Sequence, residues 1–134
     1  MIEKLAELHK IVFGDKGWGA DEIMALKKSG AEVLGNENAM IIYRAAADEA
    51  EILTIAVHPD RRREGLASAL IALMEKELKN AKKIFLEVSV ENTAATQLYK
   101  SLGFSETAKR PGYYQGVDAI LMAKEIHSNK ERII

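Results

Sequence analysis

The sequence predicts an α/β or α+β fold, a central sheet with helices packed on its faces. Three observations predict it. Apolar residues recur at helical spacing in long segments, aliphatic residues occupy every second position in a later segment, and the elements follow the order helix, helix, strands, helix, strand, helix, strands. The 134 residues contain no repeat and no linker, so we expect a single domain over residues 1–126 and a charged tail over residues 127–134.

The N-terminal part of the chain predicts two helices and a hairpin. The first helix is indicated by apolar residues at helical spacing, which are Ile2, Leu5, Leu8 and Val12. The glycine-rich segment GDKGWG ends it in a loop, and a second helix is expected from Asp21 to Ser29, stopped by Gly30. The segments AMIIYRAAA and AEILTIAV then predict two strands joined near Asp48 and Glu49.

The rest of the chain alternates between helices and strands. A broad apolar stripe predicts a helix from Gly65 to about Asn80. In KIFLEVSV the aliphatic residues share one strand face, and Glu87 lies on the other. NTAATQLYKSLG predicts a helix capped by Asn92 and ended at Gly103. FSETAKR and VDAILMAKEI are the last strands, joined through PGYYQG.

Composition excludes several functional classes. The net charge of −1 argues against nucleic-acid or membrane-surface binding through bulk charge. Since the chain has no cysteine, it can form no disulfide, thiolate metal site or catalytic thiol. His9, His58 and His127 show no ligand spacing, so we expect no metal. No apolar run approaches membrane-spanning length, and we expect a cytoplasmic protein.

The segment RRREGLA places three arginines at the start of the helix from Gly65. A helix N-terminus offers unpaired N–H groups and partial positive charge, both of which favour phosphate. Gly65 lets an anion come close to the backbone, and Ala67 keeps the first turn small. Taken alone, the segment fits a phosphate site and an ordinary surface loop equally well.

Two motifs together resemble the GNAT acyl-CoA N-acetyltransferases. Residues 62–67 are similar to that family's Gln/Arg-x-x-Gly-x-Gly/Ala pyrophosphate loop, and LEVSVENTAATQLYKSLGF is similar to its fifth strand and following helix. The resemblance covers about residues 40–126. It implies the GNAT fold, a mixed and mostly antiparallel sheet with helices on both faces. Here the family's first strand is expected to be missing, because the chain opens on a helix.

Further residues resemble the ribosomal-protein alanine N-acetyltransferases of that family, namely Trp18, Leu86-Glu87-Val88, Tyr99, Arg110, Tyr113, Tyr114, Asp118-Ala119 and Met122. The resemblance implies an acetyl-CoA-dependent enzyme that acetylates the N-terminal α-amine of a protein such as a ribosomal protein. Direct attack in a ternary complex is expected, because no cysteine can carry the acetyl group.

The resemblance also implies residue roles, with Glu87 as general base and Tyr99 as the acid that protonates the leaving thiolate. A backbone N–H at the strand end near residues 55–57 would polarise the acetyl carbonyl. The expected contacts to acetyl-CoA are Ile55, Ala56, Val57, Arg62, Arg63, Glu64, Gly65, Leu66, Ala67, Ser68, Asn92, Ala95 and Tyr99. The expected acceptor contacts are Trp18, Tyr113 and Tyr114.

Each of these residues also has an ordinary structural interpretation. Without the resemblance, Glu87 would be a solvent-facing strand residue, Tyr99 and Trp18 packing residues, and Asn92 a helix cap. Two other functions stay open. The acceptor could be a small amine or a lysine side chain, or the chain could be a non-catalytic acyl-CoA-binding or partner-binding module in which another chain completes the missing strand. Monomer and homodimer are both compatible with the sequence, and no direct nucleic-acid or membrane partner is expected.

Overall fold

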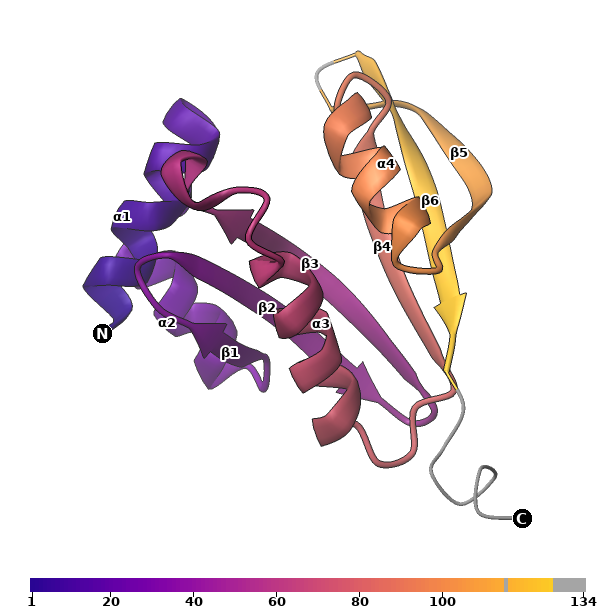
Figure 1. Cartoon of the computed structure of the whole chain (residues 1–134), viewed down its shortest axis with the longest axis horizontal. Helices are drawn as coiled ribbons and strands as arrows, with labels where there is room; N and C mark the ends of the chain where they lie inside the picture. Colours follow the sequence, from indigo (N-terminus) through magenta and orange to yellow (C-terminus); the bar gives the residue numbers. More distant parts are fainter. Residues whose placement is uncertain (115, 127–134) are drawn as a thin grey trace. The chain divides into compact units, whose positions relative to one another are not determined.

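The computed structural model describes residues 1–114 and 116–126, and the predicted tail at 127–134 lies outside the described residues. The elements, labelled in Figure 1, are α1 (Ile2–Phe13), η1 (Gly14–Lys16), α2 (Ala20–Lys28), β1 (Glu32–Gly35), β2 (Ala39–Ala46), β3 (Glu49–Val57), η2 (Pro59–Arg61), α3 (Leu66–Glu77), β4 (Lys83–Ser89), α4 (Thr93–Ser101), β5 (Ser105–Tyr114) and β6 (Val117–Glu125). The strands form one sheet in the order β1-β2-β3-β4-β6-β5. The chain divides into two compact units, Met1–Arg44 with Ile52–Leu78 (unit 1) and Ala45–Glu51 with Lys79–Ile134 (unit 2).

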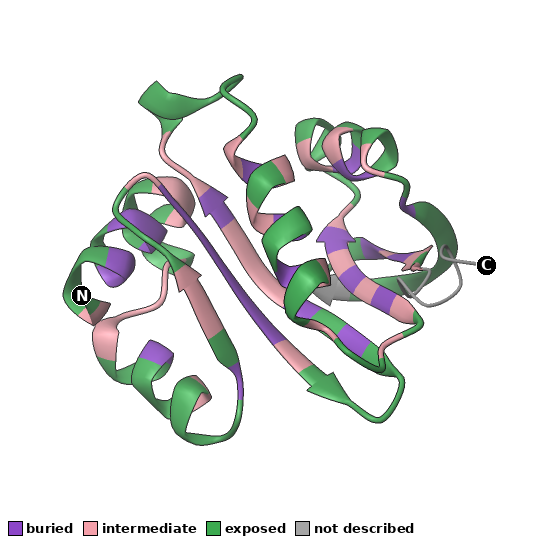
Figure 2. Ribbon diagram, turned by 60° about the horizontal axis from the view of Figure 1, so that its bottom comes forward, coloured by how far each residue is buried: buried purple, intermediate pink, exposed green. Residues whose placement is uncertain are grey.

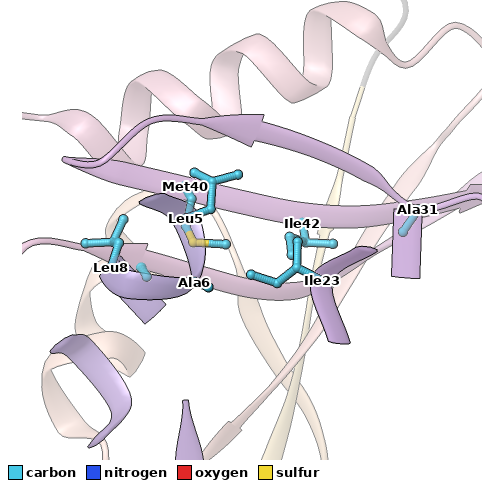
Figure 3. Close-up of a cluster of buried hydrophobic side chains, with 8 residues drawn as sticks. Leu5, Ala6, Leu8, Ile23, Ala31, Met40 and Ile42 are labelled. Atoms are coloured by element: carbon cyan, nitrogen blue, oxygen red, sulfur yellow. The ribbon is translucent and has the colours of Figure 1, made fainter. Parts of the chain in front are cut away.

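Unit 1 has its core between β2 and the first two helices. Figure 3 shows Met40 and Ile42 of β2 among side chains of α1 and α2, including Leu5 and Ile23. Tyr43, which follows Ile42 and points to the other face of β2, is also buried. Its hydroxyl donates to Glu77 of α3 at 3.2 Å. Because β2 is buried on both faces, its sequence is a continuous apolar run rather than an alternating one.

Unit 2 is built on the central strand β4. The start of β4 pairs with β3 in parallel, and its whole length pairs with β6 in antiparallel register. The aliphatic residues of β4 are buried while the residues between them are partly exposed, which confirms the predicted alternation (Figure 2). α4 lies on the aliphatic face, since Gly103 at its end faces Lys124, the cross-strand partner of Ile84.

The structure confirms the predicted order of helices and strands and differs from it in three places. The four-residue strand β1 was not expected, because it is too short to show a periodic pattern. α3 ends at Glu77 rather than near Asn80. The PGYYQG segment is not simply a connection, because β5 continues through Pro111 to Tyr114. An edge strand tolerates proline because the missing N–H need not serve the ladder.

No strand precedes α1 in the described residues, and none of their helices is long and apolar enough to cross a membrane.

The histidine of α1 is a buried polar group in unit 1. His9 is only 3% exposed. Its Nε2 lies 2.8 Å from Thr54 Oγ1, and its Nδ1 accepts a hydrogen bond from the Trp18 backbone N–H at 2.8 Å. Because Nδ1 is an acceptor, neutral His9 carries its proton on Nε2 and donates to Thr54.

Burial lowers the pKa of His9 from 6.5 to about 4, and the nearby Glu22 carboxylate opposes this shift only in part. The unfolded chain therefore binds a proton at this histidine before the folded chain does. The contribution of neutral His9 to the free energy of unfolding is fully present above pH 6.5. It is lost as the pH falls from 6.5 toward 4, by on the order of 3 kcal/mol for this one group.

Urea unfolding at several pH values between 4.5 and 7.5 checks this prediction. We expect the free energy of unfolding to vary less with pH in His9→Gln than in the wild type. His58→Gln, which alters a histidine at the end of β3 and keeps His9, should retain the wild-type slope. Parallel slopes for the wild type and His9→Gln would contradict it.

Candidate functional site

A first group of candidate residues forms the loop before α3, in unit 1. Arg62 is extended, Arg63 has a φ of 66°, and Gly65 has a φ of 76°. Glu64 between them does not have positive φ, so two left-handed residues flank a residue of negative φ. Backbone N–H groups in such a tight turn can converge on an anion.

Gly65 leads from this loop into α3, and it makes no side-chain cap. The N–H groups of the first turn, on Leu66, Ala67 and Ser68, therefore have no side-chain acceptor from the cap position. A Cβ built at Gly65 would meet no atom within 4 Å, so the backbone is open on that side. This geometry suits a phosphate group better than an ordinary capped helix start does.

The arginines of the loop differ in their partners. Arg61 pairs with Glu64, with Nε 3.1 Å from both carboxylate oxygens. Arg62 Nε donates to the Val57 carbonyl oxygen at 3.4 Å. Among the described residues, Arg63 has no hydrogen-bond or ion-pair partner. Its charge is therefore available to a ligand, whereas that of Arg61 is largely compensated.

Three of the predicted cofactor contacts stand at the end of β3, directly before this loop. These are Ile55, Ala56 and Val57. Ala56 is 2% exposed and belongs to the unit 1 core, which fixes the strand end on which the loop is built. The loop and the strand end thus form one rigid feature of unit 1.

A second group of candidate residues belongs to unit 2 and centres on Glu87. Its side chain is on the face of β4 opposite Leu86 and Val88, as the alternation predicted. Glu87 Oε1 accepts a hydrogen bond from Arg110 Nη2 of β5 at 2.9 Å. The other oxygen, Oε2, is buried and accepts no hydrogen bond from the described residues. A carboxylate with one oxygen held and one unused is suited to accept a proton.

Tyr99 of α4 is 7% exposed, and its ring meets that of Phe104 edge-on at 5.8 Å between centroids. Burial raises the pKa of Tyr99 to about 12, so the hydroxyl keeps its proton at neutral pH. Because α4 packs on the aliphatic face of β4, Tyr99 and Glu87 lie on opposite faces of the strand. The two side chains are not hydrogen-bonded to each other.

Asn92 and Ala95 are brought together at the start of α4. The Asn92 Oδ1 accepts a hydrogen bond from the Ala95 N–H at 3.1 Å, which confirms the predicted helix cap.

Trp18 belongs to unit 1, where its ring stacks on His9 with centroids 4.7 Å apart and packs against the core. From the sequence, His9 was tested only for metal-ligand spacing, which it lacks, and its contact with Trp18 was not predicted.

Tyr113 and Tyr114 belong by their backbone to the end of β5, and their side chains lie outside the described residues. The β5 ladder is irregular between Arg110 and Tyr114, where the Gly112 N–H donates to Asp118 Oδ1 at 2.9 Å.

In residues 1–114 and 116–126, no group of three or more histidine, aspartate or glutamate side chains could hold a metal ion.

The chain is similar in sequence to known acetyltransferases. The profile of the acetyltransferase (GNAT) family matches residues 14–104. The [ribosomal protein bS18]-alanine N-acetyltransferase of Escherichia coli (strain K12) is 41% identical over 98 residues, which are 69% of this chain and 66% of that protein. The protein of the same name from Salmonella typhimurium is 37% identical over 123 residues, 87% of this chain and 79% of that protein.

The crystal structure of the Escherichia coli ribosomal-protein-S18-alanine N-acetyltransferase superimposes with a TM-score of 0.81 and 31% identity, covering 93% of this chain and 87% of that one. The sequence and structural comparisons therefore agree on the fold over nearly the whole described chain. They confirm the resemblance to ribosomal-protein alanine N-acetyltransferases and the predicted fold class. The chain belongs to the acetyltransferase (GNAT) family.

Proposed function

We propose that the protein transfers an acetyl group from acetyl-CoA to the N-terminal α-amine of a protein, with a ribosomal protein as the favoured acceptor. The observation that carries the proposal is the buried, unused Oε2 of Glu87, in a chain similar to enzymes named for N-terminal alanine acetylation. Glu87 and Tyr99 of unit 2 would supply the base and the acid for such a transfer, and the loop from Arg62 to Ser68 of unit 1 would supply backbone N–H groups for a phosphate.

The residues fit acetyl-CoA as the acetyl donor. When bound, acetyl-CoA supplies a thioester, which transfers its acetyl group readily to an amine. The loop from Arg62 to Ser68 would hold the pyrophosphate through backbone N–H groups, with Arg63 adding charge. Asn92, Ala95 and Tyr99 at α4 would contact the remainder of the donor, and the N–H groups of residues 55–57 would polarise the acetyl carbonyl.

The side chains of unit 2 would move the protons. Glu87 Oε2 takes a proton from the acceptor ammonium, directly or through water, so that the amine can attack. The Tyr99 hydroxyl gives its proton to the departing sulfur, and the second proton that the nitrogen loses on forming the amide returns through water to the Tyr99 oxygen. An α-amine has a pKa near ~8, against ~10.4 for lysine, so an N-terminus needs less help from the base. This difference favours the α-amine as acceptor, and Trp18, Tyr113 and Tyr114 would contact its peptide.

Two peptides test the acceptor class. We expect CoA release with a peptide that begins Ala-Arg and has a free N-terminus. The same peptide, blocked at its N-terminus and carrying a lysine, should give little or none. Turnover with the blocked peptide alone would shift the assignment to lysine side chains. Tight acetyl-CoA binding without turnover on any amine would indicate a non-catalytic module.

Gly65→Ala tests the donor loop. Gly65 has positive φ, which costs about 1–2 kcal/mol in alanine, and the added methyl group projects where a phosphate would bind. We expect the KM for acetyl-CoA to rise by about tenfold, the loss of one charge-assisted hydrogen bond. Steady-state kinetics with the Ala-Arg peptide measures it.

Gly30→Ala is the matched control for this substitution. Gly30 also has positive φ and open space around its Cβ position, but it follows α2 rather than the donor loop. Both variants should lose similar stability, and only Gly65→Ala should raise the KM. An equal KM in the two variants would count against phosphate binding at this loop.

A further inference from the structure

The inference concerns Arg110, to which neither the motif reasoning nor the comparisons give a role. Arg110 stands on β5 and Glu87 on β4, and β6 lies between the two strands. Arg110 is paired in register with Ala119 of β6, and Glu87 is paired with Leu121 two residues along. The two side chains therefore point to the same face of the sheet and meet across a complete strand.

The ion pair divides the two oxygens of the carboxylate. Arg110 Nη2 donates to Oε1 at 2.9 Å, the length of a charge-assisted hydrogen bond. Oε2 is buried and accepts nothing from the described residues. A free glutamate side chain samples several rotamers, and holding it in one of them costs side-chain entropy. With Oε1 held by Arg110, that cost is met before the acceptor binds.

The backbone around Arg110 supports this arrangement. After a register shift between Glu106 and Ala108, the β5–β6 ladder is regular as far as Arg110↔Ala119 and becomes irregular again immediately afterwards. Ala119 is fully buried, and its single methyl group on the intervening strand leaves room for longer side chains to meet above it. Arg110 is thus the last β5 residue whose direction the regular ladder fixes before the irregularity.

We propose that Arg110 is the positioning residue of the reaction, holding Glu87 so that Oε2 faces the acceptor amine. This role rests on the proposed function. A purely structural role would be a weak one, because the Arg110 side chain is 47% exposed and water screens its charge. Loss of Arg110 should therefore affect catalysis much more than stability.

The experiment compares kcat and KM with the Ala-Arg peptide, and urea unfolding, for Arg110→Met, Arg110→Lys, Glu87→Gln and the double variant Glu87→Gln/Arg110→Met. Misplacing a catalytic group by about 1 Å can cost on the order of 100-fold in rate. We expect Arg110→Met to lower kcat by about 10- to 100-fold with an unchanged KM for acetyl-CoA. Arg110→Lys should recover part of the loss.

Two comparisons separate positioning from other effects. In the Glu87→Gln background, Arg110→Met should lower kcat no further, because Arg110 acts only through Glu87. Lys109→Met, at the neighbouring β5 residue on the opposite face, should behave as the wild type. If Arg110→Met keeps wild-type kcat, or lowers kcat equally in both backgrounds, the positioning role is wrong. If the wild type itself acetylates neither peptide, the proposed function fails and this role fails with it.

Discussion

Glu87→Gln should lower kcat by about 100- to 1,000-fold at pH 7. The amide keeps the size of the side chain and can still accept a hydrogen bond from Arg110, but it cannot take a proton from the acceptor. The KM for acetyl-CoA should stay unchanged, because the donor loop belongs to unit 1. Initial rates with the Ala-Arg peptide at saturating acetyl-CoA measure the loss.

The pH dependence of this variant gives a second, independent check. Without a base, the rate follows the fraction of acceptor that is already neutral, so it should rise by about tenfold per pH unit until the α-amine titrates near pH ~8. Glu91→Gln, in the turn that follows β4, is the control and should have wild-type kcat. A kcat within threefold of wild type in Glu87→Gln would rule out Glu87 as the base.

Tyr99→Phe should lower kcat by about 100-fold because the leaving thiolate loses its proton donor. The ring keeps its edge-on contact with Phe104, and the hydroxyl makes no hydrogen bond to the described residues. Stability should therefore change little. Since the pKa of Tyr99 is raised to about 12, wild-type kcat should show no loss from this group up to about pH 11.

Tyr43→Phe is a matched control, because it removes another buried tyrosine hydroxyl whose pKa is raised to about 12. The Tyr43 hydroxyl donates to Glu77 in unit 1, so its loss should cost about 1 kcal/mol of stability and leave kcat unchanged. We therefore expect Tyr99→Phe to lower kcat and keep stability, and Tyr43→Phe to lower stability and keep kcat. If Tyr99→Phe lost stability and kept kcat, Tyr99 would be only a packing residue.

Most of the fold followed from local patterns in the sequence. The alternation in KIFLEVSV placed Glu87 opposite the aliphatic face of β4, and the structure confirms that placement. The Asn92 cap and the helix after Gly65 were also predictable, because capping and helical periodicity depend on residues only a few positions apart. The strand β1 was not predictable, since four residues carry too little pattern and owe their structure to pairing with β2.

The sequence by itself therefore determined the order of the elements, the helix that begins after Gly65, and the strand face that carries Glu87. Only the tertiary structure decided that Arg110, 23 residues from Glu87 along the chain, holds its Oε1 across β6. It also decided that His9 is buried against Thr54 and anchors Trp18. The reason is physical: a periodic pattern fixes the direction of a side chain, whereas its distant partners depend on strand order, register and helix packing.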